Sequence, residues 1–202
     1  MTTENQQELQ CRLNECKLKQ QTELSLSNID LTEIPMEVAE FSWLTELYLA
    51  DNQITSLSPI SKMTNLQLLG CYNNKITDLA PVAKLTKLVK LNCNDNYITD
   101  LSPLAGLSNL SILRCQGNRI VDLSPLAGLT KLTSLASSNN QLTDLSPLAK
   151  LAELTGLWCS SNQIVDLSPL SGLTKLIGLW CHNNQIVDFS PLARLTNLTI
   201  FN

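Results

Sequence analysis

LTELYLADNQITSLSPISKMTN, the stretch from Leu44 to Asn65, is the first copy of a pattern that returns every 22 residues along the chain. The later copies follow one another without an insertion, and they begin at Leu66, Leu88, Leu110, Leu132, Leu154 and Leu176. An eighth copy begins at Leu198 and stops at Asn202. The shared pattern is L-x-x-L-x-[L/C/S]-x-x-N-x-[I/L]-x-x-[L/F]-x-P-[I/V/L]-x-x-[L/M]-x-x. A repeat of this length predicts a solenoid, in which each unit buries its apolar side chains against the neighbouring units.

Each unit begins with a short strand. Between Leu88 and Cys93, the apolar residues Leu91 and Cys93 alternate with polar residues, which is the period of a β-strand. Stacked units place these strands in a parallel sheet with a spacing of about 4.8 Å. The ninth position is always asparagine, and we expect its amide to hydrogen-bond the backbone where the chain leaves the strand. These residues are Asn52, Asn74, Asn96, Asn118, Asn140, Asn162 and Asn184.

The second half of each unit predicts a short helical turn. In the typical segment from Asp122 to Leu126, Ser124 is expected to be the N-cap and Pro125 the first helical residue. Only about seven residues remain before the next strand, so a single 3₁₀ or α turn fits. An aspartate precedes most of these turns, and we interpret it as a capping residue, since one carboxylate per coil gives too few oxygens for calcium. The aspartates are Asp78, Asp100, Asp122, Asp144, Asp166 and Asp188.

The segment L-x-x-L-x-L-x-x-N-x-I, at Leu44 to Ile54, and its cysteine form at Leu154 to Ile164 resemble the leucine-rich repeat family. The 22-residue period and the return segment D-L-S-P-L-A-x-L resemble the internalin-type subclass. The resemblance covers about Gln21 to Asn202. It implies an α/β solenoid: a right-handed superhelix with a concave parallel sheet, short 3₁₀ turns on the convex side, and a concave face that binds other proteins.

The two ends depart from the repeat. Residues 3–20 are predicted to form a helix that covers the first coil, with Leu9, Leu13 and Cys16 on one face and Leu18 beside them. The segment Thr3 to Gln6 fits a capping box. At the other end, Phe189 and Phe201 replace leucine, and either these rings close the core or the natural protein continues. The predicted division is residues 1–20 for the capping helix, 21–43 for an atypical first repeat, 44–197 for seven regular repeats, and 198–202 for the start of an eighth.

Charge and hydropathy exclude several classes of protein. The net charge is −4, with acidic and basic residues scattered along the chain, which argues against a nucleic-acid partner. No apolar run is long enough to span a membrane. The first residues lack the basic and apolar segments of a secretory signal, so we expect a cytoplasmic protein. We expect a monomer, with association through the C-terminal edge as the alternative.

The cysteines follow the repeat and predict no chemistry. Five of them occupy the sixth position, where Leu49 and Ser137 also stand, so a small buried side chain explains them better than a metal site. Only Cys11 and Cys16 are expected to react with thiol reagents. Cys181 and the single histidine, His182, are neighbours on a strand and point to opposite faces. With no catalytic motif in the chain, we expect neither an enzyme nor a cofactor.

Recognition is expected at the third, fifth and seventh positions, which point outward from the sheet. Trp158 and Trp180 share the fifth position in consecutive units, with Gly156 and Gly178 beside them. Exposed tryptophans are enriched at binding hot spots. The predicted partner-binding residues are Trp158, Trp180, His182, Arg114, Tyr48 and Tyr72. The sequence therefore favours a non-enzymatic protein–protein interaction module, and the alternative is a structural or regulatory segment of a larger signalling protein.

Overall fold

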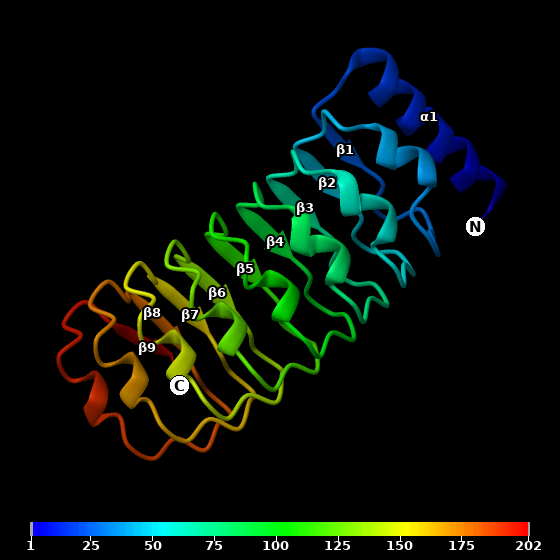
Figure 1. The fold of residues 1–202 in the computed structure, drawn as a ribbon. Helices are drawn as coiled ribbons and strands as arrows, with labels where there is room; N and C mark the ends of the chain where they lie inside the picture. Colours follow the sequence, from blue (N-terminus) through cyan, green and yellow to red (C-terminus); the bar gives the residue numbers. More distant parts are fainter. Residues whose placement is uncertain (1, 202) are drawn as a thin grey trace.

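Each sequence repeat forms one coil of an elongated stack (Figure 1). The structure, a computed structural model, describes residues 2–201, apart from the side chain of Phe201. The predicted outward residue Asn202 and the ring of Phe201 therefore lie outside the described part of the chain. Helix α1 stands at one tip of the stack and strand β9 at the other, so the order of the coils in space is their order in the sequence.

Within residues 2–201, the strands form one parallel sheet of nine, in the order β1 to β9. Equivalent positions face each other: Leu91 of β4 pairs with Leu113 of β5, 22 residues later. The strands are β1 Glu23–Ser25, β2 Glu46–Tyr48, β3 Leu68–Gly70, β4 Lys90–Asn92, β5 Ile112–Arg114, β6 Ser134–Ala136, β7 Gly156–Trp158, β8 Gly178–Trp180 and β9 Thr199–Phe201. The predicted parallel sheet is confirmed.

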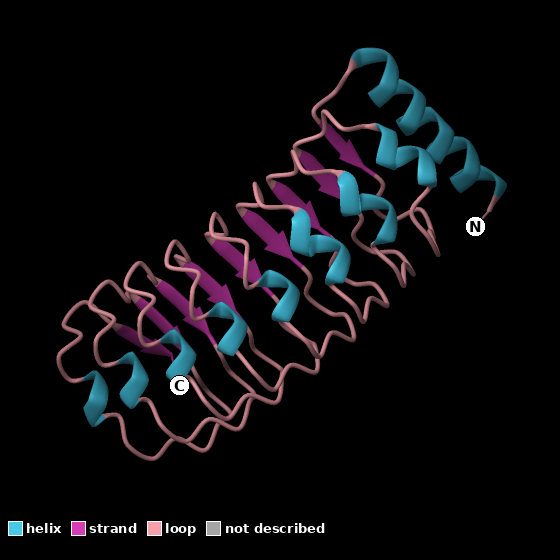
Figure 2. Ribbon diagram, viewed as in Figure 1, coloured by secondary structure: helices cyan, strands magenta, loops and turns pink. Residues whose placement is uncertain are grey.

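The return segments form 3₁₀ turns on the side of the stack opposite the sheet (Figure 2). They are η1 Met36–Glu40, η2 Ser58–Lys62, η3 Ala80–Lys84, η4 Ser102–Leu104, η5 Ser124–Leu126, η6 Ser146–Leu148, η7 Ser168–Leu170 and η8 Ser190–Leu192. A single turn fits between strands, as the spacing predicts, and proline occupies the first or second position of each turn from η2 to η8.

The prediction that serine caps these turns is wrong, because the aspartate two residues earlier does so. Asp122 Oδ1 accepts the backbone N–H of Ser124 at 2.7 Å, and Ser124 Oγ donates to Asp122 Oδ2 at 2.6 Å. Serine is instead the first residue of the turn. The hydrogen bonds from Ser124 lower the pKa of Asp122, since they stabilise its charged form. The predicted capping role of the aspartates is confirmed.

One continuous apolar core runs between the sheet and the turns. Leu91 and Leu113 from the sheet and Leu104 from a turn are each at most 1% exposed. The repeat cysteines Cys71, Cys93, Cys115, Cys159 and Cys181 are buried in the same core. Trp43 of the first coil stacks on Phe41 with ring centroids 5.2 Å apart, and its Nε1 donates to the Gln21 carbonyl at 2.9 Å. The core therefore reaches into the atypical first coil.

The repeated asparagines form the predicted ladder between coils. Asn118 Nδ2 donates to the carbonyls of Cys115 and Gln116 in its own coil, each at 3.1 Å, and to that of Cys93 in the preceding coil at 3.0 Å. Its Oδ1 accepts the N–H of Ile98 at 3.0 Å. One side chain thus satisfies backbone groups that the turn off the strand leaves unpaired.

Helix α1, Thr3–Lys19, buries Leu9, Leu13 and Cys16 as predicted. Two other expectations for it are wrong. Thr2, not Thr3, is the N-cap, and its side chain accepts the N–H of Asn5 at 3.2 Å. Leu18 is 84% exposed, because it falls on the side of the helix that faces away from the first coil.

Candidate protein-binding surface

The candidate site lies on the outward side of the sheet. We call this surface the concave face and define it by the third, fifth and seventh residues of each coil. Trp158 of β7 and Trp180 of β8 are direct neighbours in the sheet register. Their rings are stacked, with centroids 4.4 Å apart and an interplanar angle of 9°. The predicted side-by-side arrangement of the two tryptophans is confirmed.

The tryptophan rings rest on the glycines two residues before them. A Cβ atom on Gly156 would lie 2.7 Å from Trp158 Cζ3, and one on Gly178 would lie 2.5 Å from Trp180 Cζ3. Only glycine therefore lets each indole lie down along its strand. As a consequence the rings are half-buried, and not exposed as the sequence suggested.

Two adjoining hollows on the concave face share Trp158 as a wall. The first has a volume of about 350 Å³ and lies over β7 and β8, with a largely apolar lining. It is lined by Thr155, Gly156, Trp158, Ile177, Gly178, Trp180 and Thr199. The second has a volume of about 240 Å³ and is lined by Asn94, Arg114, Gln116, Ser134, Ala136 and Trp158. An apolar subsite thus lies beside a polar one that contains a cation.

The other predicted residues divide between this region and the opposite end. His182 is exposed beside the tryptophans, and its Nδ1 lies 3.0 Å from Ser160 Oγ. Arg114 is exposed two strands from Trp158. Tyr48 and Tyr72 lie on the coils of β2 and β3, far along the sheet from the tryptophan pair. The two adjoining hollows therefore bring together Trp158, Trp180 and Arg114, while His182 lines a separate small hollow past the end of β8.

Tyr48 is held in place by a hydrogen bond and by packing against the sheet. Its hydroxyl donates to Glu46 Oε2 at 2.7 Å, and this bond to a carboxylate raises the pKa of Tyr48 to about 12. Its ring also packs against Gly70, where an added Cβ would lie 3.3 Å from Tyr48 Cδ1. Tyr48 is therefore fixed on the surface of the sheet.

Thr155 and Ile177 line the apolar hollow, and sequence reasoning did not include them. They occupy the second position of their coils, which flanks the outward residues. The signal that could have found Ile177 is a large apolar residue at a position that most other units fill with threonine, glutamine or serine. It is 58% exposed and adds to the apolar surface beside the two tryptophans.

The cysteine column offers no reactive thiol to this surface. Burial raises the pKa of Cys93 to about 12, and it also raises the pKa of Cys181. Cys181 points into the core while His182 points outward, so the two do not form a catalytic pair. Among residues 2–201, no three His, Cys, Asp or Glu side chains are grouped so as to hold a metal ion. The same part of the chain contains no helix of the length and apolarity needed to cross a bilayer.

Comparison with known proteins agrees with this architecture. The family described as leucine rich repeats (2 copies) matches residues 42–78, 64–106, 108–151 and 152–194. The chain therefore belongs to the leucine-rich repeat family. Proteins of this family are in general protein-interaction modules, and their fold is typically non-enzymatic. No curated protein matches the sequence.

Solved structures identify the subclass. The crystal structure of internalin C2 from Listeria monocytogenes is 42% identical, with a TM-score of 0.86 over 89% of this chain and 80% of that one. Internalin F of the same organism is 39% identical, with a TM-score of 0.81 over 83% of this chain and 50% of that one. The functional domain of Listeria internalin J, described as including a cysteine ladder, is 28% identical, with a TM-score of 0.60 over 89% of this chain and 48% of that one. The chain is a leucine-rich repeat protein of the internalin type.

Proposed function

We propose that the chain is a non-enzymatic binding module that holds a protein partner on its concave face, centred on Trp158 and Trp180. The observation that carries this proposal is the glycine-floored tryptophan pair. Two large apolar rings stay half-exposed and stacked on adjacent strands, where the equivalent position of the other regular coils holds tyrosine, glycine, asparagine, arginine or alanine. Tryptophan contributes more to binding than most residues because it buries a large rigid area.

The geometry supports a contact surface better than a catalytic one. The rings form one wall of an open hollow of about 350 Å³, and no strongly nucleophilic or metal-binding group lines it. His182, Arg114, Gln116 and Asn94 supply polar groups around the apolar centre. This arrangement of an apolar centre and a polar rim is typical of protein–protein interfaces.

The test is affinity capture from the source cell with three baits: the natural chain, the double variant Trp158→Ala/Trp180→Ala, and a control with Lys62→Ala and Lys84→Ala on the convex turns. Proteins captured by the natural chain and the control, but lost with the double variant, support the proposal. Capture of the same proteins by all three baits contradicts it and favours the structural or regulatory segment.

Thermal unfolding of the same variants separates binding from folding. The stacked pair is half-buried, so the double variant should still unfold in one cooperative transition. Loss of the ring stacking should lower the free energy of unfolding by about 0.5–1.5 kcal/mol, in addition to the contribution of the apolar area that the rings bury. Collapse of the fold in the double variant would place the rings in the core.

The cytoplasmic location and the monomeric state expected from the sequence stay predictions. Fractionation of the source cell and sedimentation of the purified chain test them.

A further inference from the structure

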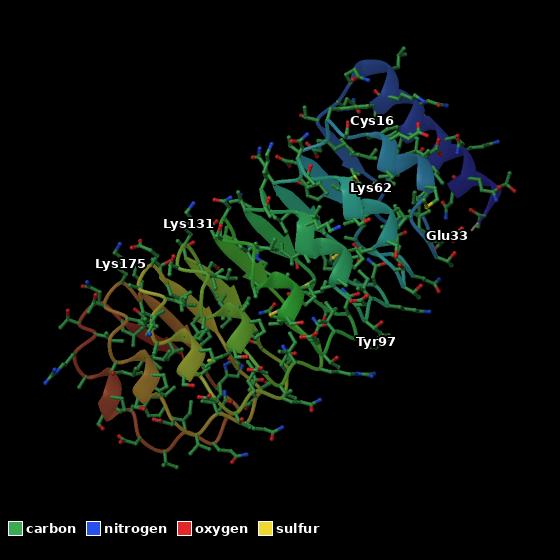
Figure 3. The ribbon with its side chains drawn as sticks, in the orientation of Figure 1. Cys16, Glu33, Lys62, Tyr97, Lys131 and Lys175 are labelled. Atoms are coloured by element: carbon green, nitrogen blue, oxygen red, sulfur yellow. The ribbon has the colours of Figure 1, made fainter. Side chains whose placement is uncertain are left out.

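Over strands β4 to β8, the charge of the concave face is opposite in sign to that of the whole chain. The net charge is −4, yet the third, fifth and seventh positions from β4 to β8 hold Lys90 and Arg114 and no aspartate or glutamate. Two more cations, Lys87 and Lys131, stand at the edge where the strands begin, and Figure 3 labels Lys131 on that long edge. A cluster of four cations therefore covers β4 to β6 and their starting edge.

None of these four cations pairs with a carboxylate of residues 2–201. Lys87 Nζ donates to Asn65 Oδ1 at 2.7 Å and Lys131 Nζ to Asn109 Oδ1 at 2.8 Å, so each ammonium group bonds a neutral amide and not a carboxylate. By contrast, Lys175 on the same edge is neutralised by Glu153 at 2.7 Å. The cations over β4 to β6 are thus available to an external anion.

Two acidic groups near this region face elsewhere. The Asp95 carboxylate lies over Gly117, beyond the ends of the strands, where a Cβ on the glycine would contact it. Glu46 lies on β2 and accepts the hydroxyl of Tyr48. The cationic cluster therefore remains open toward the tryptophan hollow, because Arg114 and Trp158 line the same cavity of about 240 Å³.

We propose, on the basis of the function proposed above, that the partner presents an extended acidic peptide segment to this face. An apolar side chain of the peptide fills the hollow over Gly156 and Gly178, against the tryptophan pair. A carboxylate about three residues away pairs with Arg114, with Lys90 close by. Arg114 and Trp158 are two strands apart, or about 10 Å, and an extended chain covers that distance in about three residues.

The chemistry of the lining favours this occupant. Arginine binds carboxylates through two parallel hydrogen bonds, which fixes direction as well as charge. Asn94, Gln116 and Ser134 surround the polar hollow and offer both donors and acceptors to a peptide backbone. The apolar hollow of about 350 Å³ is of the size that binds one large side chain.

The experiment is selection of ligands from a display library of random dodecapeptides. Four baits are compared: the natural chain, Lys90→Glu/Arg114→Glu, Trp158→Ala/Trp180→Ala, and Lys62→Glu/Lys84→Glu. The last variant carries the same change of net charge on the convex turns η2 and η3. With the natural chain and the convex control, we expect enrichment of an aspartate or glutamate about three residues from an aromatic or aliphatic residue.

With Lys90→Glu/Arg114→Glu as bait, the selected peptides should carry lysine or arginine at the position where the natural chain selects aspartate or glutamate. A fluorescent copy of the most enriched peptide should bind at least about tenfold more weakly in 500 mM than in 50 mM NaCl, since salt screens exposed charges. The convex control should keep the affinity of the natural chain within about twofold, because its substitutions lie on the turns η2 and η3, on the side of the stack opposite the sheet that carries Arg114.

Three outcomes overturn the inference. Ligands that need the tryptophans but show no acidic preference would refute the acidic partner while leaving the proposed function intact. Failure of any peptide to be enriched would refute a linear segment as the occupant. Concentration-dependent dimers of the natural chain that Lys90→Glu/Arg114→Glu abolishes would show that a second copy fills the face.

Discussion

At the scale of single residues, the asparagine column holds neighbouring coils together. Asn118 is 8% exposed, and its amide bonds to three carbonyls and one N–H across two coils. We expect Asn118→Ala to lower the free energy of unfolding by about 1–3 kcal/mol, because it leaves buried backbone groups unpaired. Urea unfolding measures this loss.

A matched control comes from the last asparagine of the column. Asn184 makes bonds of the same kind, but it is only half-buried near the end of the stack. Water can replace its bonds, so Asn184→Ala should cost less than Asn118→Ala. An unchanged stability for Asn118→Ala would mean that water bridges the ladder in the middle of the chain as well.

Also at the residue scale, the structure narrows which thiols can react. The sequence suggested Cys11 and Cys16, but Cys16 is buried against the first coil and burial raises its pKa, which leaves Cys11. A raised pKa means less thiolate at any given pH, and the thiolate is the reacting form. At pH 8 we expect Ellman's reagent to modify one thiol in the native protein and seven in denaturant. Cys11→Ser should reduce the native count to zero, and any rapid second reaction would contradict the buried column.

At the scale of secondary-structure elements, helix α1 protects the outer edge of the sheet. Arg12 Nη1 donates to the carbonyls of Ser25 at 3.2 Å and Ser27 at 3.1 Å, groups for which the sheet of residues 2–201 offers no strand beyond β1. Its Nε bonds Glu8 Oε1 at 2.7 Å. A bare strand edge is a template for unwanted pairing. The guanidinium thus takes the place of a further strand.

This contact predicts a specific effect of Arg12→Ala. Hydrogen bonds from charged groups contribute about 1.5–3 kcal/mol when partly buried, so we expect a loss near the lower end of that range. Amide exchange should accelerate first in the coil of β1. Lys19→Ala is the control, because its pair with Glu15 is exposed and surface ion pairs add little to stability. Equal losses in the two variants would show that Arg12 adds nothing beyond an ordinary surface ion pair.

How far the sequence predicted these elements depends on whether a feature repeats. The inward leucines, the asparagine ladder and the strand register follow from a fixed period, so Leu91 facing Leu113 could be deduced. The cap of each turn could not, because Asp122 and Ser124 are both good capping residues and only side-chain geometry chooses between them. The contact of Arg12 with β1 and the tilt of Trp158 over Gly156 occur too seldom in the pattern to be read from it. The same holds for the cationic cluster, which joins residues of several coils.

At the scale of the whole molecule, every coil is stabilised only by its neighbours. Substantial contacts join each strand to the next strand and each turn to the next turn, and helix α1 to β1. The stability of such a chain is close to a sum of local and nearest-neighbour terms. A weak coil in the middle can therefore uncouple the two halves, whereas a weak coil at an end cannot.

The tryptophans report the two halves separately, since Trp43 lies in the first coil and Trp158 and Trp180 lie in β7 and β8. In Trp158→Phe/Trp180→Phe, fluorescence follows the N-terminal half, and in Trp43→Phe it follows the C-terminal half. Without further change, the two urea transitions should coincide. Adding Leu113→Ala in β5, where the side chain is fully buried, removes about 2–5 kcal/mol from the middle of the core and should separate them. Leu198→Ala changes a partly buried side chain in the last coil and should leave the two urea transitions coincident. Coincident transitions with Leu113→Ala would mean that cooperativity extends beyond neighbouring coils, which the contacts of this structure do not provide.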